Sequence, residues 1–232
     1  MPGNLRDFVN RAMAYCWDET HGYSPLSDGT SHMGYPGFDC SGLIGRCLYE
    51  AGFNYPSYHV GTADMVANSM TGTDALGDAG FQEIVVTSNS YTVKPGDIIV
   101  MNHLDWTGGH AFIYMENVYA YTSTLSGYSE SYPNTKDICS KAKIEAADKR
   151  SWNVSNADDP NPNTGACTEV FVHNFDWAYF FGGYSYWNPN DQIVIARYPG
   201  GLRDDELMFL KRIRDGQFNI DSWANKFYDI GL

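Results

Sequence analysis

One stretch near the N-terminus, FDCSGLIGRCLYEAGFN (residues 38–54), constrains the fold more than any other part of the chain. Its apolar residues recur every three or four positions, roughly the spacing of one face of an α-helix. Asp39 is placed to cap the start of that helix, and Gly52 is placed to end it in a left-handed turn. We therefore predict a buried helix that begins at Cys40.

The position of Cys40 in the first turn of that helix has a chemical consequence. Unpaired backbone N–H groups and the positive end of the helix dipole favour a thiolate there. The thiolate is the form of cysteine that attacks carbonyl carbon. Cys40 is therefore a candidate nucleophile. The alternative is that it is only the first core residue of a buried helix, since unreactive buried cysteines are common.

The composition bounds the class of protein. The 232 residues are 43% hydrophobic and 15% aromatic, which is ample for a core. A net charge of −13 argues against binding to nucleic acid or to an anionic membrane surface. No apolar run of about 18 residues predicts a membrane-spanning helix. The opening MPGNLRDFVNRAM carries charges where a secretory signal would be apolar, so none is expected.

Periodicity along the chain predicts an α+β domain. Further helices are expected at 4–17 and 62–70, the second with Thr62 as its N-cap. Alternating, β-branched segments predict strands at 81–87, 96–102, 110–116, 168–174 and 192–198. Turns rather than helices join most of these strands, which favours an antiparallel sheet.

Residues 117–167 interrupt the strand pattern with a polar insertion rich in Ser, Asn, Asp and Pro. A short helix is expected within its segment KDICSKAKIEAADKR. The insertion is interpreted either as a lid or substrate rim, or as a tolerated surface elaboration. We place one catalytic domain at 1–204, followed by a helical tail at 205–232.

The five cysteines leave at least one thiol unpaired. Cys16 and Cys47 fall on the apolar stripes of their predicted helices and are interpreted as small core residues. Cys139 and Cys167 flank a polar segment, and they could form a disulfide if the protein works outside a cell.

A cysteine nucleophile needs a base beside it and a polar group that orients the base. Two of the six histidines are candidates, His110 at the start of one predicted strand and His173 near the end of another. If these strands are neighbours, both imidazoles would lie near Cys40. The other histidines, which fall in predicted loops, have no comparable setting: His21, His32, His59 and His103.

Three segments together resemble the NlpC/P60 cysteine peptidases. They are Phe38-Asp39-Cys40-Ser41-Gly42 at a helix start, Pro95-Gly96-Asp97-Ile98 before a strand, and Gly109-His110 opening the next strand. The resemblance covers about residues 4–116 and 168–198, and it is greatest to the phage-lysin branch. It implies a papain-like fold with N-terminal helices packed on an antiparallel sheet.

The resemblance also implies roles for particular residues. Cys40 would be the nucleophile, His110 the base and Tyr23 part of the oxyanion site. The family's third residue is a His, Asn or Gln one strand after the base, which points to His173, with Asn117 as the rival. The residues expected to contact substrate are Asp39, Ser41, Gly109 and Tyr35.

The activity so implied is hydrolysis of an amide bond in bacterial peptidoglycan, without a cofactor, by a phage lysin or virion component. Either the bond between the muramyl lactyl group and L-Ala or a bond next to D-Glu is a suitable target. Three alternatives stay open. They are a metal-dependent hydrolase using His103, Asp105, His110 and His173, a non-catalytic wall-binding or virion module, and an acyltransferase or transpeptidase.

Overall fold

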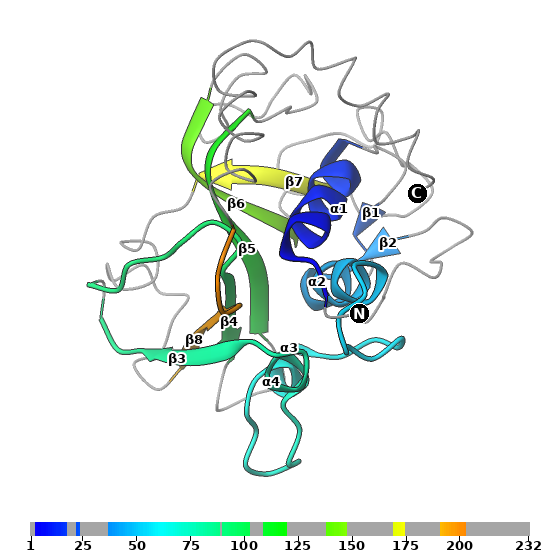
Figure 1. The fold of residues 1–232 in the computed structure, drawn as a ribbon, viewed down its shortest axis with the longest axis vertical. Coiled ribbons are helices and arrows are strands. Elements are labelled where there is room, and N and C mark those ends of the chain that lie inside the picture. Colours follow the sequence, from blue (N-terminus) through cyan, green and yellow to red (C-terminus); the bar gives the residue numbers. More distant parts are fainter. Residues whose placement is uncertain are drawn as a thin grey trace.

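The computed structural model describes residues 3–17, 22–23, 37–88, 90–102, 109–119, 138–147, 169–174 and 191–202. Within them the chain combines a sheet with a few helices (Figure 1). The helices are α1 (Leu5–Trp17), α2 (Cys40–Glu50), α3 (Thr62–Met65) and α4 (Ala75–Asp78). The strands are β1 (Gly22–Tyr23), β2 (Gly37–Phe38), β3 (Gln82–Val86), β4 (Ile98–Asn102), β5 (Gly109–Tyr119), β6 (Ile138–Ala147), β7 (Glu169–Asn174) and β8 (Gln192–Arg197).

The strands form one sheet in the order β2-β1-β7-β6-β5-β4-β8-β3. Every pair in it is antiparallel except β1 with β2. All five strands predicted from alternation are present, as β3, β4, β5, β7 and β8, and the predicted antiparallel arrangement is confirmed for them.

Strand β6 is the largest departure from the sequence prediction. It comes from the segment expected to hold a short helix, and that expectation is wrong. It lies between β5 and β7, pairing Ile144 with Ile113 on one side and with Val172 on the other. The segment predicted as an insertion therefore contributes a central strand of the sheet.

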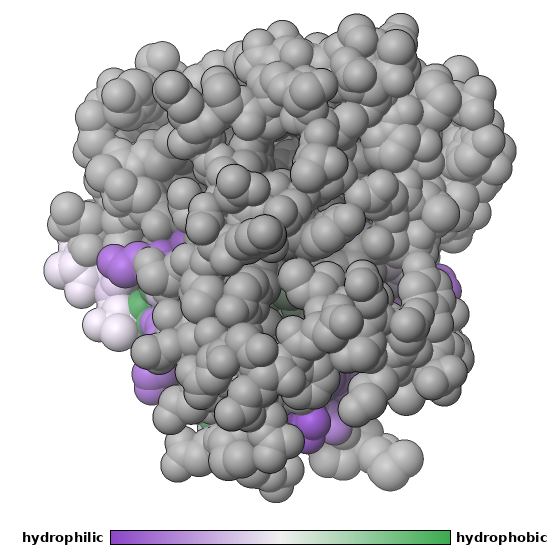
Figure 2. Space-filling view, turned by 90° about the horizontal axis from the view of Figure 1, so that it is seen from above, coloured by the Kyte–Doolittle hydropathy of each residue, from purple (hydrophilic) through white to green (hydrophobic). Residues whose placement is uncertain are grey.

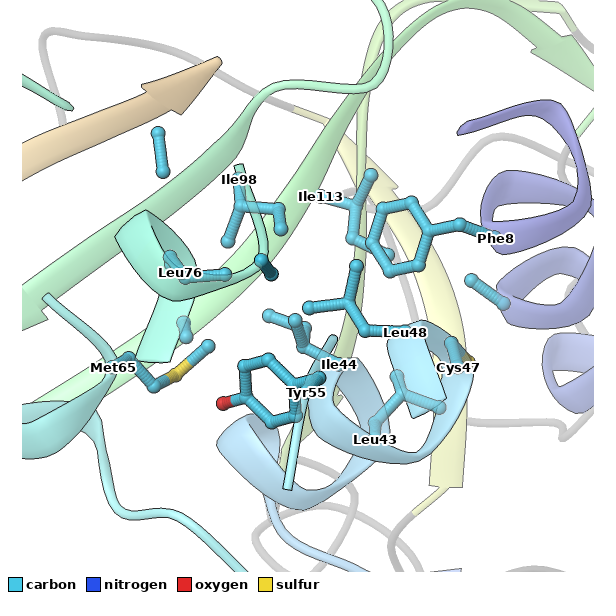
Figure 3. Close-up of a cluster of buried hydrophobic side chains, with 14 of the residues drawn as sticks. Phe8, Leu43, Ile44, Cys47, Leu48, Tyr55, Met65, Leu76, Ile98 and Ile113 are labelled. Atoms are coloured by element: carbon cyan, nitrogen blue, oxygen red, sulfur yellow. The ribbon is translucent and has the colours of Figure 1, made fainter. Parts of the chain in front are cut away.

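Helix α2 is held against the sheet by its apolar face. Figure 3 shows Ile44 and Leu48 directed toward Ile98 and Ile113 of the sheet, and Leu43 belongs to the same core cluster. All five side chains are fully buried, so at about 1.5–3 kcal/mol each their burial is a main source of stability. The C-terminal end also follows the prediction, because Gly52 adopts a positive φ of 78° just after the helix.

Helix α3 is shorter than predicted. It ends at Met65 rather than near residue 70, and its N-cap is Gly61 rather than Thr62. The chain turns extended at Val66, and the side chain of Asn68 then accepts a hydrogen bond from the N–H of Met70 at 2.9 Å. Such a local side-chain bond offers the backbone an alternative to another helical turn.

The Pro95-Gly96-Asp97-Ile98 segment forms the turn that leads into β4. Gly96 has a φ of 88°, which a residue with a side chain rarely adopts. The carboxylate of Asp97 is 2% exposed and accepts two hydrogen bonds from Arg197 of β8, at 2.9 and 2.7 Å. It also accepts one from the N–H of Lys94 at 2.7 Å. Asp97 thus joins this turn to the neighbouring strand.

We expect Asp97→Ala to lower the free energy of unfolding by about 3 kcal/mol, because it leaves Arg197 without its buried partner. The matched control is Asp7→Ala, which removes a half-exposed i,i+4 partner of Arg11 on α1. That change should cost no more than about 0.5 kcal/mol. Urea denaturation of both variants measures the difference, and equal losses would contradict the structural role of Asp97.

Figure 2 shows the molecule from above, where the described residues that reach this face are mainly hydrophilic. None of the helices in the described part of the chain has the length and apolar character that crossing a bilayer requires.

Candidate active site

The start of α2 is built by Asp39. Its backbone is extended, with φ −92° and ψ 179°, and its carboxylate accepts a hydrogen bond from the N–H of Gly42 at 2.6 Å. The first helical backbone bond runs from the N–H of Leu43 to the carbonyl of Asp39 at 3.0 Å. The N–H of Cys40, in the first turn, therefore has no carbonyl partner inside the helix.

Cys40 and His110 are in contact across the interface between α2 and the sheet. Cys40 is 7% exposed at the first helical position, and His110 lies at the beginning of β5. The imidazole hydrogen-bonds the side chain of Cys40 and also that of Glu145. Nε2 is the nitrogen that faces Glu145. The structure thus brings together the two residues that sequence analysis ranked first.

Glu145 of β6 is the orienting group beside the base. Its carboxylate oxygen Oε2 lies 2.6 Å from Nε2 of His110, and the side chain is completely buried. A buried carboxylate at this distance holds one tautomer and stabilises the protonated imidazole. Cys40, His110 and Glu145 therefore have the arrangement that thiol chemistry requires of a nucleophile, a base and an orienting group.

Neither residue predicted for this third position lies beside His110. His173 on β7 pairs with Lys143 of β6, so the condition that its strand neighbours that of His110 is not met. Asn117 lies seven residues along β5 from His110, roughly 23 Å away in an extended strand. The inserted strand β6 separates β5 from β7 and supplies Glu145 in their place.

Glu145 was missed because it lies in a segment interpreted as an insertion. A signal for it does exist in the sequence. In β6 the residues Ala142, Ile144 and Ala146 alternate with Lys143 and Glu145, which is the two-residue period of a strand.

A second cationic group contacts Glu145 from its own strand. Lys143 is 5% exposed, and its Nζ lies 2.8 Å from Oε1 and 2.9 Å from Oε2 of Glu145. The same nitrogen lies 5.3 Å from the centre of the Phe112 ring. Both oxygens of the carboxylate are thus engaged, one of them by His110 as well.

These contacts determine how firmly His110 holds its proton. Burial of the imidazole by itself lowers its pKa, but the negative charge of Cys40 and its hydrogen bond, followed by Glu145, act the other way. Together they raise the pKa of His110 from 6.5 to about 9. At neutral pH His110 is therefore an imidazolium beside the sulfur of Cys40.

A second network lies on the other side of Cys40. Oδ2 of Asp39 lies 2.8 Å from Nε2 of His59, and Oδ1 accepts from the hydroxyl of Ser41 at 3.1 Å. Sequence analysis gave His59 no role, since it lies in a loop far along the chain from Asp39 with no local pattern. The network fixes the cap whose backbone carries Cys40.

We expect Asp39→Ala to destabilise the fold by about 1–2 kcal/mol and to reduce kcat/KM about 100-fold, since the cap positions the nucleophile. Asp39→Asn, which keeps an acceptor for Gly42, should lose less of both. The matched control is Asp74→Ala, which removes an equivalent cap from α4, where the carboxylate accepts from Gly77 at 2.8 Å. It should cost stability without loss of activity. Turnover assays and urea unfolding of the two variants measure these effects. Equal losses of activity in Asp39→Ala and Asp74→Ala would refute the proposal that the Asp39 cap positions the nucleophile.

The other predicted site residues divide by location. Tyr23 on β1 pairs with Phe38 of β2, two residues before Cys40, so its backbone lies close to the site. Ser41 is buried at the helix start, and a Cβ added at Gly109 would clash with the side chain of Thr62. Tyr35 lies outside the described residues, as do Cys167 of the predicted disulfide and the tail at 205–232.

A shallow, open depression lies beside this network. Its walls are the outer face of α2 and the segment 56–60, and the side chains that line it include Arg46, Tyr49, Tyr58 and His59. Tyr58 is 69% exposed and Tyr49 48% exposed. The depression begins at Gly42, two residues from the nucleophile.

The residues of the metal alternative are not brought together in the described part of the chain, where no group of three or more His, Cys, Asp or Glu side chains is placed to hold a metal ion. His103 and Asp105 lie outside the described residues. Comparison with known proteins gives no assignment, because no family model, curated protein or solved structure matches this chain.

Proposed function

We propose that this protein is a thiol hydrolase that cleaves an amide bond in bacterial peptidoglycan. The observation that carries the proposal is the contact of Cys40, at the start of a helix, with an imidazole that a fully buried Glu145 orients. This combination supplies a nucleophile, a proton donor and a fixed tautomer within one site. An unreactive core cysteine, the alternative interpretation, needs none of these neighbours.

The chemistry proceeds by acyl transfer. The Cys40 sulfur attacks the amide carbonyl carbon, and the negative charge moves to the carbonyl oxygen. As the carbon–nitrogen bond breaks, the imidazolium of His110 gives its proton to the leaving amine, and a thioester remains. Neutral His110 then takes a proton from water, which attacks the thioester and releases the carboxylic acid. Thiolate and imidazolium are thereby restored.

We propose two hydrogen-bond donors for the oxyanion of that intermediate. The N–H of Cys40 has no acceptor inside α2 and lies at the positive end of the helix. The hydroxyl of Tyr23 is the second proposed donor, supported by the pairing of its backbone with Phe38. Removing one such donor typically reduces kcat by about 10²–10³.

The substrate class rests on the resemblance to NlpC/P60 cysteine peptidases. Its three segments occupy coherent positions in the fold, as the start of α2, the turn into β4 and the start of β5. These positions, with the helices packed on an antiparallel sheet, support a papain-like arrangement. We further propose Ser41, Gly109 and the depression beside His59 as the surroundings of the wall peptide.

An acyltransferase or transpeptidase is the second candidate function. It uses the same thioester and differs only in whether an amine or water attacks it. The observation that favours it is the low exposure of Cys40, because a site with little water gives an amine acceptor a longer-lived thioester.

Mass spectrometry of bacterial cell walls digested by the intact protein tests the proposal. New soluble muropeptides are expected, and their termini identify the bond as the lactyl–L-Ala amide or one next to D-Glu. Products carrying an added amine rather than a new carboxylate would indicate acyl transfer. No products from walls of several peptide types would favour a non-catalytic wall-binding or virion module.

A further inference from the structure

Lys143 is a buried cation that the proposed mechanism does not use. It is 5% exposed, and its Nζ lies within 2.9 Å of both oxygens of Glu145. Burying an ammonium group is costly unless an anion and further contacts offset the loss of water. Here Glu145 supplies the anion, and the Phe112 ring at 5.3 Å supplies a favourable face. The position of Lys143 is therefore specific rather than incidental.

Lys143 and His110 share one atom. Nζ lies 2.9 Å from Oε2 of Glu145, and Nε2 of His110 lies 2.6 Å from the same oxygen. A common partner places the two nitrogens within about 4–6 Å, the range in which one charge changes the protonation of another. The ammonium of Lys143 is thus an electrostatic neighbour of the catalytic pair.

Within the described part of the chain, the groups around Glu145 come from three elements. His110 of β5 and Lys143 of β6 contact Glu145 directly. Cys40 of α2 contacts the other side of this group through the imidazole of His110. On β7 the residue paired with Glu145 is Phe171, which does not titrate, and the residue paired with Lys143 is His173, a titratable group. The Tyr114 hydroxyl, at the position that pairs with Lys143, donates to Glu116 at 3.1 Å.

The proposed function requires Cys40 as thiolate and His110 as imidazolium, and in that state the negative Glu145 and the positive Lys143 bring the total charge of the four residues to zero. Without Lys143 the same arrangement would carry one excess negative charge in a largely buried site, and each titrating group would hold its proton more tightly.

We propose that Lys143 is a positioning residue that acts through Glu145 to set the pH range in which the Cys40 thiolate and the His110 imidazolium coexist. The inference rests on the proposed function for its effect on turnover. The reactivity of Cys40 that it predicts can be measured in the resting protein without substrate.

The test compares two neutral variants, Lys143→Met and Lys143→Gln, with the unchanged protein. Lys143→Gln keeps a hydrogen-bond donor for Glu145, which separates loss of charge from loss of packing. The rate of alkylation of Cys40 by iodoacetamide is followed against pH, with the modified residue identified by peptide mass spectrometry. The pH dependence of kcat/KM on cell walls is measured in parallel. Both variants should shift the alkylation midpoint and both limbs of the kcat/KM profile upward by about one pH unit.

Two further variants act as controls. Lys143→Arg keeps the charge and should restore the profile of the unchanged protein. Lys141→Met removes the same charge from an exposed position two residues away on β6 and should shift nothing. A fall in rate with unmoved limbs in both neutral variants would reduce Lys143 to a packing residue and overturn the inference. Shifted alkylation profiles in a protein that releases no wall products would overturn the proposed function alone.

Discussion

Cys40→Ala should abolish wall hydrolysis, with a loss of kcat of at least about 10⁴, while the protein stays folded. Removal of the nucleophile leaves only binding and oxyanion stabilisation, which account for a small residual rate in enzymes that use covalent intermediates. The fold should tolerate the change, because Cys40 lies at the edge of the apolar face of α2 and alanine is a good helix former. Release of soluble muropeptides and urea unfolding measure the two effects.

The matched control for this variant is Cys47→Ala. Cys47 lies two turns along the same helix, is completely buried and belongs to the main core cluster. Its truncation leaves a small cavity, so about 1 kcal/mol of stability should be lost with turnover unchanged. A Cys40→Ala protein that still releases products would refute the nucleophile. A Cys47→Ala protein that releases no muropeptides would show that activity depends on the integrity of α2 and not on the Cys40 thiol in particular.

The parts of the site that could be predicted are those with local signals. The start of α2 was predictable because the cap and the helical period lie within a few residues of each other, and Asp39 does accept from Gly42. His110 was predictable as the first polar residue of an alternating strand. Each signal reflects backbone conformation, which is determined mainly by neighbours in the sequence.

The parts that could not be predicted depend on contacts between distant segments. The order of the strands decides which residue meets His110, and nothing in the sequence of β6 states that it lies between β5 and β7. The polar composition of the surrounding residues concealed a strand that the alternation from Ala142 to Ala146 would have indicated. His59 reaches Asp39 from a loop, and loops carry no period.

The role of Glu145 is tested by Glu145→Gln, which should reduce kcat/KM by roughly 10²–10⁴. The amide keeps the size of the side chain but removes the charge that stabilises the imidazolium. Lys143, left without its anion, would then further disfavour a proton on His110. The variant therefore loses both the orientation of the base and the proton that it gives to the leaving amine.

The pH dependence gives the direction of this effect. The pKa of His110 is raised from 6.5 to about 9, so in the unchanged protein the alkaline limb of activity should lie near pH 9. Because the proton is held more tightly in the folded state, its contribution to stability is complete below pH 6.5 and is lost as the pH rises through about 9. Glu145→Gln removes one cause of the rise, so both the limb and the loss of stability should move to lower pH.

Glu116→Gln is the matched control, since it makes the same chemical change on the neighbouring strand β5. Glu116 accepts a hydrogen bond from Tyr114 and is not among the groups that raise the pKa of His110, so the alkaline limb should stay near pH 9. Profiles of kcat/KM and of thermal unfolding against pH distinguish the two carboxylates. An alkaline limb that Glu145→Gln leaves in place would mean that Cys40 alone holds the proton on His110, and that the inserted strand contributes packing rather than charge to the site.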